Sequence, residues 1–181
     1  AYRKAKEQGK PLVRYQPTLS MVAMDAVSEA GWQERLRFAL EHGNFYSLQK
    51  SITHLEDESQ SLVETRSYLR EEDGDIDQRE FLAAAEACQL GAELDRAIFP
   101  GIISAIRNGP GNQRHLLTIS AHSIQDEAFT PWLIQQISES RIDFDKILLQ
   151  ISAPTIVDNR SGAVLLSQEL RQLSGGLVLT D

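Results

Sequence analysis

The feature of this sequence that most restricts its fold is a pair of strand-like segments joined by a short polar linker. Residues 45–55 and 62–69 both favour extended structure, and about half a dozen mostly polar residues separate them. A parallel pair needs a crossover of roughly a dozen residues or more, so two neighbouring strands this close in sequence must pair antiparallel. After residue 70 the pattern changes to alternating helices and strands, which predicts parallel βα units. The sequence therefore predicts an α/β fold that begins with an antiparallel hairpin.

The other expected elements follow from hydrophobic periodicity and from turn residues. Helices are expected over residues 32–41, 81–90, 93–107, 124–140 and 161–173, and strands over 116–120, 146–151 and 177–179. Gly91 is a candidate end for the second helix, and Pro100 predicts a kink in the third. This is about two-thirds of a (β/α)₈ barrel, which typically needs about 250 residues. The barrel is therefore expected to be incomplete at the C-terminus of this chain.

Composition excludes several classes of function. The 181 residues carry a net charge of −8, whereas binding to duplex nucleic acid needs a basic face. No apolar run approaches the ~18 residues of a membrane span, and no signal peptide is visible in the first residues. Because the chain starts without Met, it is expected to be a piece of a longer protein. The single cysteine, Cys88, excludes an internal disulfide and indicates a reducing cytoplasm.

Five segments, in the correct order, resemble the EAL family of cyclic-di-GMP phosphodiesterases. They read ALEHGNFYSLQKSITHL, SYLREEDGDIDQREFLAAAEACQLGAELDR, LLTISAHSIQDEAFTPWL, ILLQISAPTIVDN and GGLVLTD. The resemblance implies an EAL-type modified TIM (β/α)₈ barrel with an antiparallel first strand over residues 29–181. Residues 1–28 then resemble the tail of a GGDEF domain followed by a linker, an order that is common in the family.

The sequence departs from the family at the positions that the resemblance assigns to metal ligands and their neighbours. The signature Glu is replaced by Arg66, an Asn by Thr118, two Glu by Gln150 and Ala153, an Asp by Thr180 and a Gln by Lys50. A slip of one residue in the hairpin would restore Gln49 to the last of these positions. Mg²⁺ and Mn²⁺ prefer charged oxygen ligands, and Arg66 puts a permanent cation there instead. The resemblance therefore implies a degenerate domain without Mg²⁺ or Mn²⁺ and without hydrolytic activity.

Ligand binding is a separate question from catalysis. In the family, the residues that Arg70, Leu69 and Asp95 match belong to the nucleotide site, and the arginine holds a phosphate. Residues i, i+2 and i+4 of a strand point the same way, so Arg66, Tyr68 and Arg70 are expected on one face. We expect Arg66 to take the charge-neutralising place of the absent metal, and Tyr68 to stack or pack beside the dinucleotide.

Structural roles are open alternatives for the same side chains. Arg70 can pair with the acidic residues that follow it, at 71–73, and Arg66 with a carboxylate inherited from the fold, such as Glu86. Asp95 can pair with Arg96 or serve a helix cap. The four histidines show no metal-ligand spacing, and no Cys pair accompanies them.

The expected function is a cyclic-di-GMP receptor of the degenerate FimX and LapD type, which regulates type IV pili or adhesion and needs no cofactor. Such a cytoplasmic module relays nucleotide binding to a protein partner, PilZ-like or other, and can form a homodimer within a larger membrane- or pole-associated protein. Neither nucleic-acid binding nor membrane insertion is expected. A protein-interaction scaffold that binds no nucleotide is the alternative from another class, and residual phosphodiesterase activity is a third.

Overall fold

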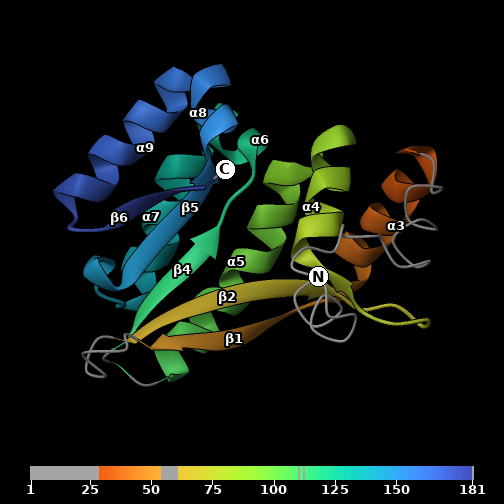
Figure 1. Cartoon of the computed structure of the whole chain (residues 1–181), viewed down its shortest axis with the longest axis horizontal. Helices are drawn as coiled ribbons and strands as arrows, with labels where there is room; N and C mark the ends of the chain where they lie inside the picture. Colours follow the sequence, from red (N-terminus) through yellow and green to blue (C-terminus); the bar gives the residue numbers. More distant parts are fainter. Residues whose placement is uncertain (1–28, 54–60, 110, 112, 181) are drawn as a thin grey trace, which may run out of the picture.

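The computed structural model describes residues 29–53, 61–109, 111 and 113–180, and these form a mixed sheet covered by helices (Figure 1). The two strands of the predicted hairpin pair antiparallel, with Phe45 opposite Leu69. The described sheet has six strands in the order β1-β2-β4-β5-β6, with β3 paired to the end of β2. The strands are β1 (Phe45–Thr53), β2 (Ser61–Leu69), β3 (Ile76–Asp77), β4 (Arg114–Thr118), β5 (Ile147–Ser152) and β6 (Gly176–Thr180).

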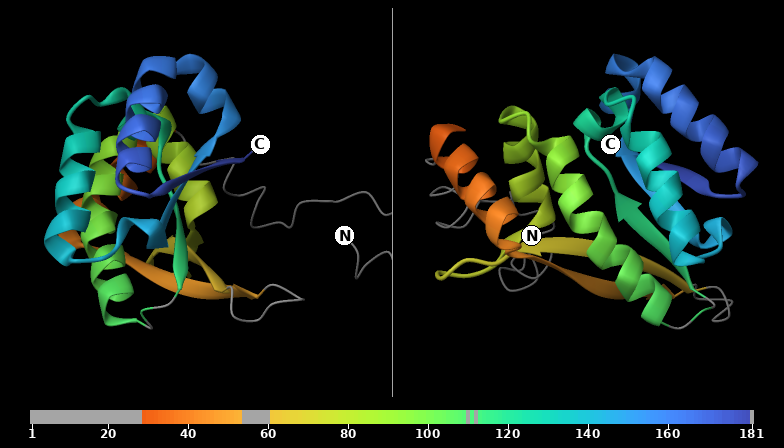
Figure 2. Two further views of the ribbon diagram at one scale, coloured as in Figure 1. Left: turned by 90° about the vertical axis from the view of Figure 1, so that its left-hand side faces the viewer. Right: turned by 180° about the vertical axis from the view of Figure 1, so that it is seen from behind.

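Strands β2, β4, β5 and β6 are parallel, as alternating βα units require. The described helices lie on one side of the sheet, and Figure 2 shows the longer ones side by side from behind. They are α3 (Glu29–His42), α4 (Gln78–Ala87), α5 (Gly91–Asn108), α6 (Ala121–Gln125), α7 (Phe129–Ser140), α8 (Ala153–Asp158) and α9 (Arg160–Gln172), with a 3₁₀ turn at Phe144–Lys146. The α/β prediction is confirmed, and the described sheet is an unclosed barrel with β1 and β6 at its edges. No described helix has the length and apolar character to cross a membrane.

Strand β2 alternates between the two faces of the sheet. Val63, Ser67 and Leu69 are buried against the helices, whereas Arg66 and Tyr68 on the other face are only half-buried. The side of the sheet that carries Arg66 and Tyr68 is called the open face. Residues that are partners in neighbouring strands point to the same side of a sheet. The pairing register therefore shows which residues of the other strands also lie on the open face.

The helix boundaries differ from the prediction at two places. Gly91 begins α5 and does not end α4, which stops at Ala87. A Cβ at this position would lie 2.8 Å from the Ser120 Oγ, so the glycine leaves room for that side chain. The segment expected as one helix over 124–140 is two helices. Its break is at Asp126, whose carboxylate accepts a hydrogen bond from the Ala128 amide at 2.9 Å. The short helix α8 was not expected from the sequence, and α5 continues through Pro100.

The hydrophobic core lies between the sheet and the helices. Phe129 is fully buried and Trp32 is 8% exposed, as the periodicity of their helices predicts. Cys88 is half-buried at the end of α4, its thiol donates to the Glu29 carbonyl at 3.5 Å, and burial raises its pKa. These contacts give the cysteine a structural role.

Candidate functional site

The positions at which the sequence departs from the EAL pattern that it resembles lie together at the carboxyl ends of the parallel strands. Thr118 of β4 is the direct partner of Gln150 of β5. The last residue pair between β2 and β4 is Thr65 with Leu117, and Arg66 follows Thr65 by one residue. Thr180 of β6 is the partner of Ser152, two residues beyond Gln150. The open face therefore carries an arginine and three neutral side chains where a metal centre would need carboxylates.

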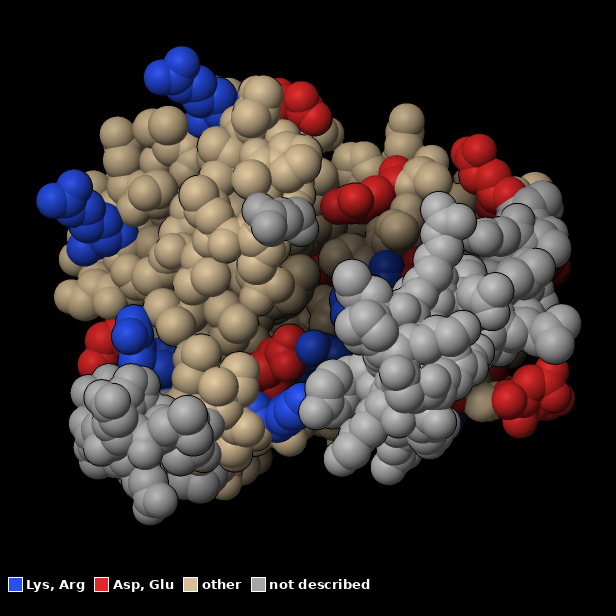
Figure 3. Space-filling view, in the orientation of Figure 1, with Lys and Arg blue, Asp and Glu red and all other residues tan. Residues whose placement is uncertain are grey.

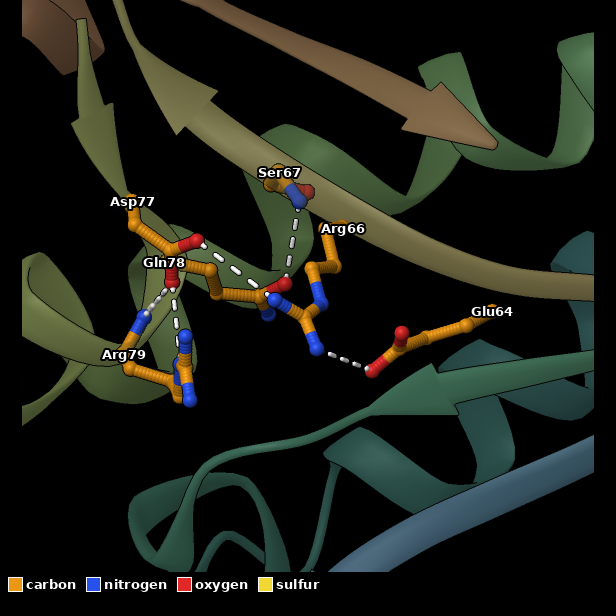
Figure 4. A network of polar contacts seen from close by, with 6 residues as sticks. All are labelled: Glu64, Arg66, Ser67, Asp77, Gln78 and Arg79. Carbon is orange, nitrogen blue, oxygen red and sulfur yellow. Dashed lines mark hydrogen bonds and ion pairs between the residues drawn. The ribbon is translucent and has the colours of Figure 1, made fainter. Parts of the chain in front are cut away.

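Arg66 is held between two carboxylates (Figure 4). Its guanidinium donates to Glu64 Oε1 at 2.9 Å, and a second nitrogen lies 3.7 Å from Asp77 Oδ2. The hydrogen bond to Glu64 raises the pKa of Arg66. An acidic partner for Arg66 was expected, but Glu86 is not that partner. Its carboxylate accepts from the Ala121 amide at 2.9 Å.

Asp77 is placed by local structure. It lies on β3 opposite Tyr68 of β2. It also caps α4, where its side chain accepts a hydrogen bond from the Arg79 amide at 3.0 Å. The next residue, Gln78, is buried and its side-chain oxygen accepts from the Ser67 amide at 3.0 Å. The bond between Gln78 and Ser67 fixes the start of α4 against the C-terminal part of β2, so Asp77 stays within reach of Arg66.

A second cluster, Tyr46, Tyr68, Arg70 and Asp75, forms where β1 and β2 meet the loop. The Tyr46 and Tyr68 rings are stacked, with centroids 5.5 Å apart and 21° between their planes. The Arg70 guanidinium lies 4.9 Å from the centroid of Tyr46. The Tyr46 hydroxyl donates to Asp75 at 2.6 Å, which raises the pKa of Tyr46. Tyr46 was not expected at this site from the sequence, because its place opposite Tyr68 is set by the register of the hairpin.

Arg70 has no carboxylate within ion-pair distance among the described residues. The following Glu71 is instead paired with Arg35 of α3. The pairing of Arg70 with its acidic neighbours, expected as one alternative, is therefore not seen. Arg70 is exposed at the end of β2 and holds its position through its backbone amide, which donates to the Asn44 carbonyl at 2.9 Å. Its guanidinium is available to an anionic ligand.

The structure does not bring Leu69 and Asp95 to the open face. The Leu69 side chain is 1% exposed and packs in the core on the helix side, so only its backbone can face a ligand there. Asp95 on α5 is 2% exposed, and its Oδ2 accepts from the Ser120 amide at 2.8 Å and the Ser123 hydroxyl at 2.6 Å. Of the two structural alternatives, a capping role fits these contacts, because Arg96 pairs with Asp126 at 2.6 Å.

The register also places Lys50. Lys50 is the partner of Glu64 and so shares the open face with Arg66, whereas Gln49 is the partner of the helix-facing Thr65. The hairpin therefore does not have the one-residue shift in register that would place Gln49 on the open face. Lys50 therefore adds a further cation to the face that carries Arg66.

The residues at the strand ends do not fit a Mg²⁺ or Mn²⁺ ion. Such ions need several oxygen ligands, preferably charged. The side chains that face the position are Arg66, Thr118 and Gln150, and the two nearest carboxylates are paired with Arg66. Within the described part of the chain, no group of three or more His, Cys, Asp or Glu side chains is arranged to hold a metal.

A cavity of about 690 Å³ lies beside Arg70, between α3 and the loop after β2. Its charged lining consists of Glu34, Arg35, Arg70, Glu71, Glu72 and Asp73. The four carboxylates outnumber the two arginines, so this cavity disfavours an anionic ligand. The open face, where basic and acidic side chains gather in a central hollow (Figure 3), is the better candidate.

Solved structures with the same fold include three EAL proteins. The FimX EAL domain from Pseudomonas aeruginosa bound to c-di-GMP is 23% identical with a TM-score of 0.73, over 82% of this chain and 61% of that domain. The Xanthomonas citri FimX EAL domain in complex with c-diGMP is 19% identical with a TM-score of 0.71, over 83% and 60%. The Vibrio cholerae LapD S helix-GGDEF-EAL protein bound to c-di-GMP is 15% identical with a TM-score of 0.73, over 84% and 37%.

This chain therefore spans about three-fifths of the FimX EAL domains. No curated protein matches it. The family model described as the EAL domain matches residues 33–181, which is the whole sheet together with all but the start of α3. The chain belongs to the EAL domain family.

Proposed function

We propose that this chain is part of a cyclic-di-GMP receptor that binds the dinucleotide on the open face and does not hydrolyse it. The observation that carries the proposal is the pairing of an unneutralised Arg70 with the stacked Tyr46–Tyr68 rings, beside strand ends that lack metal ligands. The FimX and LapD structures with c-di-GMP support the choice of ligand. The receptor would act in the cytoplasm and pass its occupancy to a protein partner.

The chemistry of the cluster suits a cyclic dinucleotide. A guanidinium can donate two parallel hydrogen bonds to one phosphate, which a lysine ammonium cannot. Aromatic faces stack on nucleobases with little dependence on sequence. Arg70 and Tyr68 come from the same strand face, so phosphate and base contacts are both available at the end of β2.

Arg66 is proposed to neutralise ligand charge in place of a metal, but two carboxylates compete with the ligand for its guanidinium. Glu64 and Asp77 already balance its charge. A phosphate must displace or share these contacts, so Arg66 contributes less to affinity than Arg70. Removing the competing carboxylate with Glu64→Gln should release Arg66 toward the ligand.

We expect isothermal titration with EDTA present to show binding of cyclic-di-GMP, and Arg70→Ala to weaken it roughly ten- to hundredfold, since hydrogen bonds to charged groups are lost. Arg70→Lys should recover part of this affinity, Arg66→Ala should have a smaller effect, and Glu64→Gln should tighten binding. Arg171→Ala on the exposed end of α9 is the matched control and should bind like the parent.

Unchanged binding in both Arg66→Ala and Arg70→Ala would contradict the proposed site. An absence of heat for the parent, with no rise in melting temperature at high ligand concentration, would favour a nucleotide-free interaction scaffold. The pre-existing Glu64–Arg66–Asp77 ion pairs favour that second function, because they leave Arg66 satisfied without a ligand.

We also expect no hydrolysis of cyclic-di-GMP in the presence of Mg²⁺ or Mn²⁺. A divalent ion beside Arg66 would be repelled, and Thr118 and Gln150 supply only neutral oxygens. Chromatography of the nucleotide after prolonged incubation measures this, with an active phosphodiesterase as the control. Metal-dependent appearance of the linear dinucleotide would show that the domain is an enzyme.

Two further parts of the proposal concern the longer protein. We propose that residues 29–181 are a degenerate EAL domain and that residues 1–28, which lie outside the described part, are the tail of a GGDEF domain followed by a linker. We also propose that the receptor works as a homodimer or with a PilZ-like partner.

A further inference from the structure

The loop that follows β2 carries four carboxylates beside Arg70, the residue proposed to bind phosphate. They are Glu71, Glu72, Asp73 and Asp75. A carboxylate that turns toward Arg70 would pair with its guanidinium and repel an anionic ligand. Two of the four are held elsewhere, because Asp75 accepts from the Tyr46 hydroxyl at 2.6 Å and Glu71 is bound by Arg35 of α3. The partner of Glu71 is thus supplied by a helix and not by the sheet.

The contact between Arg35 and Glu71 is a two-point ion pair. The Arg35 Nε donates to Glu71 Oε1 at 2.9 Å, and a terminal nitrogen of the same guanidinium donates to Oε2. Two bonds of this kind fix the orientation of the carboxylate as well as its distance. The Arg35 guanidinium also lies 4.5 Å from the centroid of the Trp32 ring on the same helix, and Trp32 is in the core. The buried ring therefore holds the guanidinium in place for Glu71.

The same helix is tied to Arg70 through the backbone. The Asn44 amide donates to the Ala39 carbonyl of α3 at 3.0 Å, and the Asn44 carbonyl accepts from the Arg70 amide at 2.9 Å. Arg35, Arg70 and Glu71 all line the cavity of about 690 Å³ beside α3. Since Glu71 follows Arg70 in the chain and shares this cavity with it, an unpaired charge on Glu71 would act on a ligand at Arg70.

We propose that Arg35 is a positioning residue for the cyclic-di-GMP site, because it holds the Glu71 carboxylate away from Arg70 and cancels its charge. This inference rests on the proposed function, since it concerns the affinity of the same site. Without Arg35, Glu71 is free to pair with the Arg70 guanidinium and to repel a phosphate. Arg35 acts through Glu71 and does not itself contact the ligand.

Isothermal titration of the whole chain with cyclic-di-GMP tests this role by rescue. We expect Arg35→Gln to weaken binding about fivefold, which is the upper range for the effect of an exposed ion pair. Adding Glu71→Gln to Arg35→Gln should restore the affinity of the parent, because a neutral amide does not compete with phosphate for Arg70. Adding Glu72→Gln instead is the matched control. It gives the same net charge and alters the same cavity, but binding should stay as weak as in Arg35→Gln.

A second measurement does not depend on the nucleotide. The side-chain Nε–H resonance of Arg70, assigned by its loss in Arg70→Ala, reports on the surroundings of the guanidinium. We expect this resonance to shift in Arg35→Gln and to return to its parent position when Glu71→Gln is added. Circular dichroism of each variant confirms that it is folded.

Three outcomes would overturn the inference. The first is parent affinity in Arg35→Gln, and the second is a rescue by Glu72→Gln equal to that by Glu71→Gln, which would indicate net charge alone. The third is an Arg70 resonance that does not move in Arg35→Gln. If the parent binds no cyclic-di-GMP, the proposed function fails, and the Arg70 resonance alone decides whether Arg35 keeps Glu71 from Arg70.

Discussion

Replacing Gly162 with alanine is expected to lower the free energy of unfolding by about 3 kcal/mol, which is the upper range for overpacking a core. Gly162 lies near the start of α9, and a Cβ at this position would be 2.0 Å from the Ile124 carbonyl oxygen. That oxygen belongs to the backbone at the end of α6, so it cannot rotate away as a side chain would. Relief requires α9 to move off α6. Urea unfolding followed by circular dichroism measures the loss.

Gly101 provides the matched control. It lies inside α5, and a Cβ built there meets nothing within 4 Å. Alanine is the better helix former by about 1 kcal/mol, so Gly101→Ala should be neutral or stabilising. Similar losses in the two variants would mean that the close approach of α6 and α9 does not restrict residue 162.

Protonation of Asp95 is expected to make the protein more stable in mild acid, by about 3 kcal/mol for this group between pH 4 and pH 7. Burial, together with the nearby charge of Glu86, raises the pKa of Asp95 from 3.8 to about 6, although the hydrogen bonds from Ser120 and Ser123 lower it. The folded protein therefore holds the proton more tightly than the unfolded chain. The stabilisation is complete below pH 4 and is lost as the pH rises through 6.

Asp95→Asn isolates this contribution. An asparagine oxygen can still accept from the Ser120 amide and the Ser123 hydroxyl, but it does not titrate. The difference in unfolding free energy between the parent and Asp95→Asn, measured at several pH values, should change by the expected amount over this window. A constant difference would show that Asp95 does not change its ionisation on folding.

The sequence reveals which side chains of the candidate site share a face, but not which residues they contact. Strand periodicity alone puts Arg66, Tyr68 and Arg70 on one face, and β2 shows that alternation. It cannot choose the partners of these side chains, because a pairing register is set by contacts between distant segments. Tyr46 reaches Tyr68 only through the hairpin, and Asp77 reaches Arg66 only through the pairing of β3 with β2.

The sequence by itself determined the antiparallel hairpin, the order of the βα units and the family. Each depends on local spacing or on motifs that are read along the chain. Only the tertiary structure decided that Leu69 and Asp95 are buried away from the open face and that Arg66 is neutralised by Glu64 and Asp77. These features depend on which side chains the packing of helices on a twisted sheet brings within a few ångströms, and that packing is a property of the whole fold.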